Sequence, residues 1–182
     1  MSNEQLLVKQ SLEGNMDSFS EIILIYHYKL RAFMVKLGAS VHDSEDLIQE
    51  VFIKVYKNLD KYDSQKNFST WIHTIAVNTW KNHIKKEQHA AVAITEDNTD
   101  KNVNVSDSNF ESLERKEIIS QMFNYLSDDT RQIIVLRFFH DMKFKEIGEV
   151  MGITTENAKM RIARALEKLQ IRFGNCLKGG VL

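Results

Sequence analysis

The sequence has no proline and contains only seven glycines and one cysteine in 182 residues. Because proline and glycine are the residues that most often break helices, their scarcity favours a mostly helical protein. The single cysteine, Cys176, excludes an intramolecular disulfide and indicates a reducing compartment. Hydrophobic residues at 43% and charged residues at 27% are close to globular averages, which excludes wholesale disorder and a disulfide-stapled miniprotein.

Long apolar runs are also missing. The N-terminus has no basic stretch followed by an apolar block, and no segment approaches the roughly 18 apolar residues of a membrane span. We therefore expect a cytoplasmic protein that is neither exported nor anchored. Charge of one sign does not dominate either, since 24 basic and 25 acidic side chains give a net charge of −1. Any attraction to nucleic acid must come from local patches.

The sequence shows no pattern of metal-binding or catalytic residues. The six histidines form no close pair or Cys/His set, and neither a glycine-rich phosphate loop nor a nucleophile beside a base is visible. We expect no metal, no cofactor, no small-molecule substrate and no enzymatic activity.

Apolar residues recur at spacings of three and four along most of the chain, which is typical of amphipathic helices. The spacing predicts a short helix near residues 3–13, a helix from Asp17 that ends at Gly38, and a helix from about Ser69 to Glu87. Between the last two, a helix carrying Leu47 to Leu59 begins near Asp43 or Ser44, whose side chains can cap it.

The character of the sequence changes between residues 89 and 116. This interval is rich in Asn, Asp, Ser and Thr, and its six acidic and three basic residues give a net charge of −3. It predicts a flexible acidic linker that avoids DNA. Periodicity resumes from Phe110, and Ser127 with two aspartates precedes a further helix. The expected architecture is all-α, with two helical domains at residues 1–88 and 117–182 joined by the linker 89–116.

Residues 144–162 have the spacing of a helix-turn-helix. Gly148 is small where the two helices cross, Gly152 permits the turn, and Thr154 can cap the second helix. That helix, residues 155–173, carries five bases and two acids. Phosphate contacts need this charge bias, whereas only a few side chains near the N-terminal half can reach base edges. The alternative is that these are solvated charges on an ordinary bundle helix.

The distinguishing pattern lies in the front half. Residues 46–87 combine an acidic, amide-bearing helix, DLIQEVF, with an aromatic and basic helix, FSTWIHTIAVNTWKNHIKK. This segment and residues 117–173 closely resemble extracytoplasmic-function sigma factors, the compact members of the bacterial sigma-70 family. The resemblance covers nearly the whole chain, with region 2 at about residues 18–88 and region 4 at about 117–173. It implies a promoter-specificity subunit; a stand-alone helix-turn-helix regulator is the alternative, but it leaves the DLIQEVF helix without a purpose.

The resemblance implies that the DLIQEVF helix docks on core RNA polymerase. Spacings of three and four place most of the implied residues on one side of that helix. A solvent-facing acidic stripe is the alternative reading, and Ile53 on the stripe weighs against it. The expected polymerase-binding residues are Asp46, Leu47, Gln49, Glu50 and Ile53.

By the same resemblance, the following loop and helix capture the single-stranded minus-10 element of the promoter. A flipped base needs a shaped pocket with hydrogen-bonding groups, and lysines hold the phosphates. Phe68 and Trp71 are assigned mainly to packing. The expected minus-10 residues are Tyr62, Ser64, Gln65, Lys66, Asn67, Asn78, Lys81, Lys85 and Lys86.

The resemblance also implies that the basic helix reads the minus-35 element. The expected residues are Thr155, Asn157, Lys159, Met160, Arg161, Ala163 and Arg164.

The sequence departs from the family pattern at several of these positions. Asn82 and Lys85 stand where the family commonly has Asp and Arg, so bidentate phosphate contact is lost while the charge is kept. Asn157 and Ala158 replace a common Thr and Val, and Met160 replaces a small polar residue. The implied partners are bacterial core RNA polymerase, promoter DNA and an anti-sigma factor, which in the family is often membrane-bound.

Overall fold

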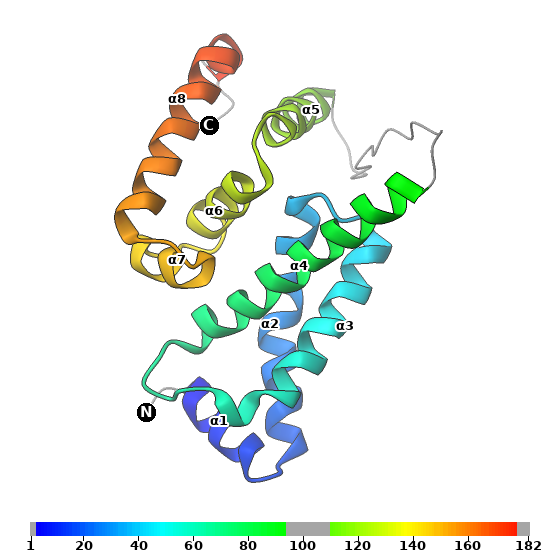
Figure 1. Cartoon of the computed structure of the whole chain (residues 1–182), viewed down its shortest axis with the longest axis vertical. Helices are drawn as coiled ribbons and strands as arrows, with labels where there is room; N and C mark the ends of the chain where they lie inside the picture. The colour runs from blue at the N-terminus through cyan, green and yellow to red at the C-terminus, as the bar shows by residue number, and fades with distance from the viewer. Residues whose placement is uncertain (1–2, 94–109, 178–182) are drawn as a thin grey trace. The chain divides into compact units, whose positions relative to one another are not determined.

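The computed structural model describes residues 3–93 and 110–177, and within these ranges every regular element is a helix (Figure 1). The prediction of an all-α chain is therefore confirmed. The chain divides into two compact units. The first contains α1 to α4, and the second contains α5, α6, α8 and most of α7.

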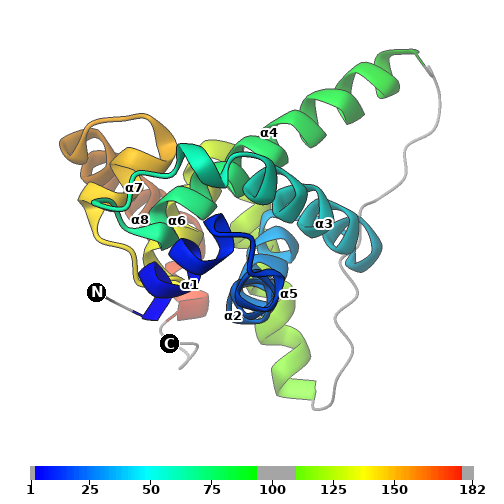
Figure 2. The same cartoon turned by 90° about the horizontal axis from the view of Figure 1, so that it is seen from below.

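The first unit is built from four α-helices and one short 3-10 helix. These are α1 (Asn3–Leu12), α2 (Met16–Leu37), α3 (Val41–Lys57), η1 (Leu59–Lys61) and α4 (Phe68–Ala93). Figure 2 shows α4 along its length. Asn15 begins α2 by accepting the Ser18 N–H at 3.1 Å. Gly38 ends α2 with φ at 114°, a left-handed conformation that glycine adopts without a Cβ penalty, as predicted.

The predicted start of α3 was wrong by about three residues. Ser40 is the cap: its hydroxyl accepts the Asp43 N–H at 3.0 Å and donates to Asp43 Oδ2 at 2.6 Å. This reciprocal arrangement satisfies a free N–H group at the helix end, so the helix starts at Val41. Ser44 is already inside the helix, where its hydroxyl donates to the carbonyl of Val41.

The core of the first unit lies between α2, α3 and α4. Leu30, Phe33 and Val51 are fully buried there, and Ile72 of α4 closes the same core. His73 is buried beside them, with Nδ1 2.7 Å from the carbonyl of Ser69 and the ring edge-on to Phe33. Close packing of these side chains fixes α4 against α3, and both helices carry predicted binding residues.

The second unit contains α5 (Phe110–Tyr125), α6 (Asp128–Phe138), most of α7 (Phe144–Met151) and α8 (Thr155–Leu177). Its core includes Leu126, Ile134, Ala165 and Leu169. Ser127 occupies the predicted cap position of α6, but its hydroxyl bonds to the Thr130 hydroxyl at 2.8 Å instead of to a backbone N–H.

Both helices beside the expected linker extend into it. Helix α4 continues to Ala93 and α5 begins at Phe110, because the alanines near residue 90 and the Glu, Leu, Arg and Lys residues after Phe110 favour helix. The rest of that interval, residues 94–109, lies outside the described residues. The domain boundaries at residues 88 and 117 stay predictions.

Candidate nucleic-acid and polymerase interfaces

The outer face of α3 carries most of the predicted polymerase-binding residues. Asp46 and Gln49 are exposed, Ile53 is 54% exposed, and Glu50 is half-buried. Leu47 is only 4% exposed and packs into the core, so it supports the helix from beneath. The structure therefore places four of these five side chains on or near the outer face.

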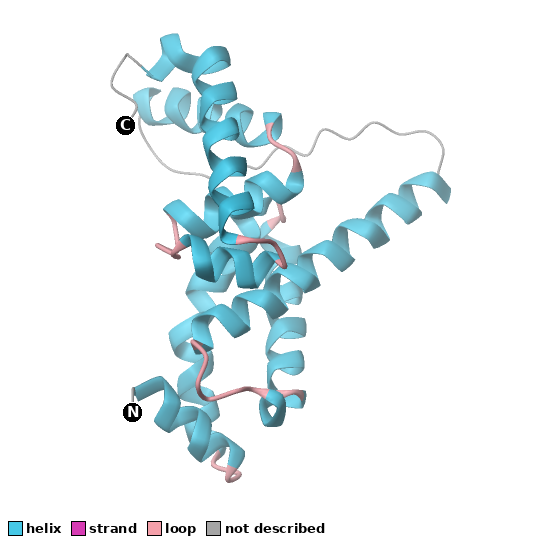
Figure 3. Ribbon diagram, turned by 60° about the vertical axis from the view of Figure 1, so that its left-hand side comes forward, coloured by secondary structure: helices cyan, strands magenta, loops and turns pink. Residues whose placement is uncertain are grey.

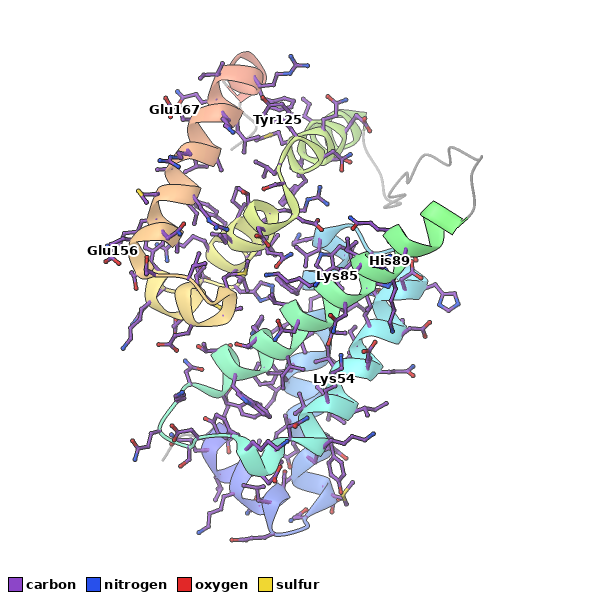
Figure 4. All side chains as sticks on the ribbon, in the orientation of Figure 1. Lys54, Lys85, His89, Tyr125, Glu156 and Glu167 are labelled. Atoms are coloured by element: carbon purple, nitrogen blue, oxygen red, sulfur yellow. The ribbon has the colours of Figure 1, made fainter. Side chains whose placement is uncertain are left out.

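A lysine that the sequence analysis missed connects this face to α4. Lys54 Nζ lies 2.7 Å from Glu50 Oε1 and donates to Thr79 Oγ1 at 3.0 Å. Thr79 is next to Asn78, a predicted DNA contact on α4. Figure 4 labels Lys54 on α3. Only the three-dimensional structure brings Lys54 to Thr79, since the two residues are 25 positions apart.

The loop between η1 and α4, residues 62–67, is drawn in pink in Figure 3. Tyr62 shapes this loop from within. Its ring is 8% exposed and packs edge-on against Phe68, with the ring centroids 5.1 Å apart, and at a tilt against Trp71, with the centroids 5.3 Å apart. Burial raises the pKa of Tyr62, as do the charges of Glu4 and Asp63, so the phenol stays protonated and donates to the carbonyl of Lys66. Tyr62 was predicted to contact DNA, but its ring lies within the packing beneath the loop.

Two more side chains fix the loop by local hydrogen bonds. Asp63 Oδ1 accepts the Gln65 N–H at 3.0 Å, and Asn67 Oδ1 accepts the Ser69 N–H at 2.8 Å at the start of α4. Such Asx turns hold the backbone in a defined conformation. The exposed side chains of Ser64, Gln65 and Lys66 then project from this fixed backbone.

Helix α4 presents the remaining predicted minus-10 residues on one face. Asn78, Lys85 and Lys86 are exposed, and Lys81 is half-buried. Their spacing of three, four and one residues keeps all four within a single broad stripe. Figure 4 labels Lys85 on this helix. Three ammonium groups along the stripe suit a phosphate backbone.

The predicted helix-turn-helix is confirmed in its backbone details. A Cβ added at Gly148 would lie 2.8 Å from the carbonyl oxygen of Ile153, so only glycine fits where α7 and the turn approach each other. Gly152 adopts φ at 67°, and Thr154 Oγ1 accepts the Asn157 N–H at 3.1 Å to cap α8. Ile147 and Ala158 are fully buried within the motif.

The predicted recognition helix α8 holds two kinds of side chain. Lys159, Met160, Ala163 and Arg164 are exposed. Arg161 is half-buried instead: it donates to Asn157 Oδ1 at 2.9 Å and lies 3.6 Å from Asp129 of α6. Thr155 is also half-buried. The four exposed residues form a face open to a ligand, whereas Arg161 and Asn157 bind within the unit.

Among the residues that the structure describes, no group of three or more His, Cys, Asp or Glu side chains is arranged to hold a metal ion. The same residues include no helix that is long and apolar enough to cross a membrane.

Comparison with known proteins follows the division into two units. Models of "Sigma-70 region 2" and "Sigma-70, region 4" match residues 22–90 and 122–170. The ECF RNA polymerase sigma factor SigW of Bacillus subtilis is 35% identical over 173 residues, which cover 90% of this chain and 92% of SigW. The ECF RNA polymerase sigma-E factor of Escherichia coli is 29% identical over 176 residues, covering 91% of this chain and 92% of that one.

Two solved structures share the fold. CnrH, in complex with the cytosolic domain of CnrY, superimposes with a TM-score of 0.73 at 19% identity and covers 96% of this chain and 99% of its own. The sigma factor RpoE from Bartonella quintana, in complex with the anti-sigma factor NepR, gives 0.72 at 24% identity and covers 84% of this chain and 94% of its own.

Proposed function

The chain belongs to the extracytoplasmic-function RNA polymerase sigma factors of the sigma-70 family, and on that premise we propose how its two units divide the work of starting transcription. The first unit binds core RNA polymerase and captures the melted minus-10 element, and the second reads the minus-35 duplex. The observation that supports this most is the match of both units, in this order, to one family. A stand-alone regulator needs only the second unit.

The outer face of α3 binds polymerase in this proposal. Asp46, Gln49 and Glu50 offer charge and amide groups around the exposed side chain of Ile53. An apolar centre with a polar rim is the usual composition of a protein interface. The face belongs to a helix held by its buried side against α2 and α4, so it is rigid before a partner arrives.

Strand capture falls to the loop at residues 62–67 and the exposed stripe of α4. The loop offers hydrogen-bonding groups from Ser64, Gln65 and Lys66, and the lysines of α4 offer phosphate contacts. Unpaired bases expose their Watson–Crick edges, which such polar groups can read. Tyr62 contributes by fixing the loop backbone.

Duplex reading falls to the exposed face of α8. Lys159 and Arg164 supply donors there, and Met160 and Ala163 supply apolar contact. A helix face of this kind fits the major groove. Because both units lie on one chain, weak binding by each is strengthened when polymerase presents the two promoter elements together.

The chain itself makes and breaks no bonds in this proposal, since the sigma factors to which it is related are not enzymes. It acts in the cytoplasm, where polymerase is. An anti-sigma factor silences it by covering the surfaces on α3 and α8. RpoE, which shares this fold, was solved with such a factor.

A charge reversal tests the proposal. Glu50→Lys is expected to weaken binding to core polymerase at least about tenfold, because it inverts a charge beside Ile53 on the docking face and repels Lys54. Glu21→Lys, an exposed acid on α2, is the control and should bind normally. Pull-down with core polymerase and promoter-directed transcription in vitro are the measurements. The proposed function would be contradicted if the wild-type chain did not bind polymerase but bound duplex operators by itself.

A further inference from the structure

Helix α1 lies outside the segment that the family models match, which begins at residue 22. It nevertheless packs closely on α2, and its Leu7 and Val8 side chains are buried. Figure 1 shows α1 beside the first part of α2, and α1 also contacts η1, which leads into the loop at residues 62–67. The helix is therefore part of the first unit's structure and adjoins the loop assigned above to strand capture.

The first turn of α1 makes one polar contact with that loop and one with α2. Gln5 Nε2 donates to the carbonyl oxygen of Ser64 at 3.1 Å, across 59 positions of sequence. Glu4 Oε1 accepts a hydrogen bond of 2.7 Å from the hydroxyl of Tyr26. The contact of Gln5 with the loop is direct, and that of Glu4 runs through α2.

The Tyr26 ring continues the second route into the loop. It is almost fully buried and packs edge-on against Phe68 at 5.6 Å. Phe68 packs against Tyr62, whose hydroxyl donates to the carbonyl of Lys66. The carbonyls of Ser64 and Lys66 are thus both held by hydrogen bonds. Gln5 of α1 donates to the Ser64 carbonyl directly, and Tyr62, which is linked to α1 through the packed rings of Phe68 and Tyr26, donates to the Lys66 carbonyl.

These two carbonyls bracket the exposed part of the loop. Ser64, Gln65 and Lys66 present their side chains to solvent from a backbone tied at both ends. Discrimination between bases requires hydrogen-bonding groups held within about 0.5 Å of their productive positions. Whatever holds the Ser64 carbonyl therefore influences which base the loop accepts.

We propose that α1 is a positioning element of the minus-10 reading loop, and that Gln5, through its hydrogen bond to Ser64, tunes the base preference of strand capture. Gln5 need not touch DNA for this effect. The inference rests on the proposed function, because it assumes that the loop at residues 62–67 reads the captured strand.

The test compares Gln5→Met with Gln10→Met. Methionine keeps the length and helix propensity of glutamine but loses the amide donor. Gln10 is a matched control: it lies on the same helix, and its Oε1 accepts a hydrogen bond of 2.9 Å from Ser18 of α2, away from the loop. Each variant is assembled with core polymerase and offered single-stranded oligonucleotides with each of the four bases at every minus-10 position.

Gln5→Met is expected to reduce the ratio of affinities between the preferred base and its substitutes by about 2- to 10-fold at one position, the range for losing one hydrogen bond. Gln10→Met should keep the wild-type ratio. Both variants should bind polymerase as the wild type does. Their melting temperatures should fall only slightly, because each loses a single hydrogen bond of α1. Tyr26→Phe, which keeps the ring on Phe68 but loses the bond to Glu4, should shift the same ratio less.

The outcomes separate the two ideas. If the wild-type complex captures strands selectively and Gln5→Met retains the same base ratio, the role of α1 is overturned while the proposed function stands. A uniform loss of affinity for all bases in Gln5→Met, with the ratio unchanged, also overturns it, since that is the result of a merely structural role. If the wild-type complex captures no strand, the proposed function falls and this inference with it.

Discussion

The two units prepare their binding surfaces in different ways. In the second unit the helix-turn-helix motif alone positions the binding surface. Gly148 allows the close approach of α7 and the turn, Gly152 forms the turn, and Thr154 caps α8, whose exposed face is thereby oriented. In the first unit the loop that we propose captures the strand is shaped by contacts from α1, α2 and α4, through Gln5 and the packed rings of Tyr26 and Phe68.

The difference follows from what each surface is proposed to bind. A B-form duplex has a regular groove, so a straight helix with suitable side chains fits it. A single strand has no fixed shape, and the protein must supply the pocket. A loop that serves as a pocket needs several supports, whereas a helix supports itself by its own backbone hydrogen bonds.

The largest expected effect tests whether the stability of the second unit depends on the close approach of α7 and the turn in its helix-turn-helix. Gly148→Ala should lower the free energy of unfolding of the second unit by about 3 kcal/mol, because the new Cβ would press on the Ile153 carbonyl. Gly174→Ala, with no neighbour closer than 3.8 Å, should instead be neutral or gain up to about 1 kcal/mol of helix propensity. Hydrogen exchange of each unit in the full chain measures both. Equal effects at the two glycines would refute the close crossing.

The next effect separates binding from support within α8. Arg164→Ala should weaken minus-35 duplex binding by about 2 kcal/mol without changing stability, since Arg164 is exposed. Arg161→Ala should lower stability as well, because Arg161 binds Asn157 and lies near Asp129. Duplex binding by the polymerase complex and thermal unfolding are measured together. An Arg164 variant that melts early would show that the two arginines share one role.

The smallest expected effect concerns the first unit at low pH. The hydrogen bond from Ser40 holds the pKa of Asp43 below its usual range, with nearby His83 and His42 adding to the effect. The stabilisation is present above the ordinary aspartate pKa of about 4 and is lost as pH falls through the lowered value. Asp43→Asn should remove this part of the acid sensitivity, because asparagine does not ionise. The expected change in the free energy of unfolding is only about 0.5 kcal/mol, because solvent screens the carboxylate. Thermal unfolding at about pH 7 and about pH 3 checks it; an unchanged difference would contradict the assignment.

Much of the fold could be predicted because its signals are local. Gly38, Gly148 and Gly152 act through their own backbone conformation or close approach, and apolar spacing identifies each helix. The start of α3 was missed because Ser40 and Asp43 cap the helix as a pair, and the spacing of apolar residues carries no signal for such a pair. Helix ends in alanine-rich sequence, as at Ala93, have no sharp stop signal.

The candidate sites were less predictable than the fold. Spacing correctly placed Asp46, Gln49 and Ile53 on the outer face of α3. Leu47 was added to the binding set by the family resemblance alone, although it belongs to the apolar residues that pack inward. Lys54 and Gln5 were missed altogether, since each gains its role from a partner far along the chain.

The sequence by itself determined the helices, the helix-turn-helix and the family, because periodicity, turn glycines and motif order are properties of neighbouring residues. Tertiary structure alone decided which side chains are available to a partner and which are occupied in support. Tyr62, Asn157 and Arg161 have the chemistry of binding residues, yet their polar groups bond within their own units. These hydrogen bonds join residues four apart, but tertiary packing decides the availability of the side chains, because the burial of the Tyr62 ring and the approach of Arg161 to Asp129 depend on where the core places them.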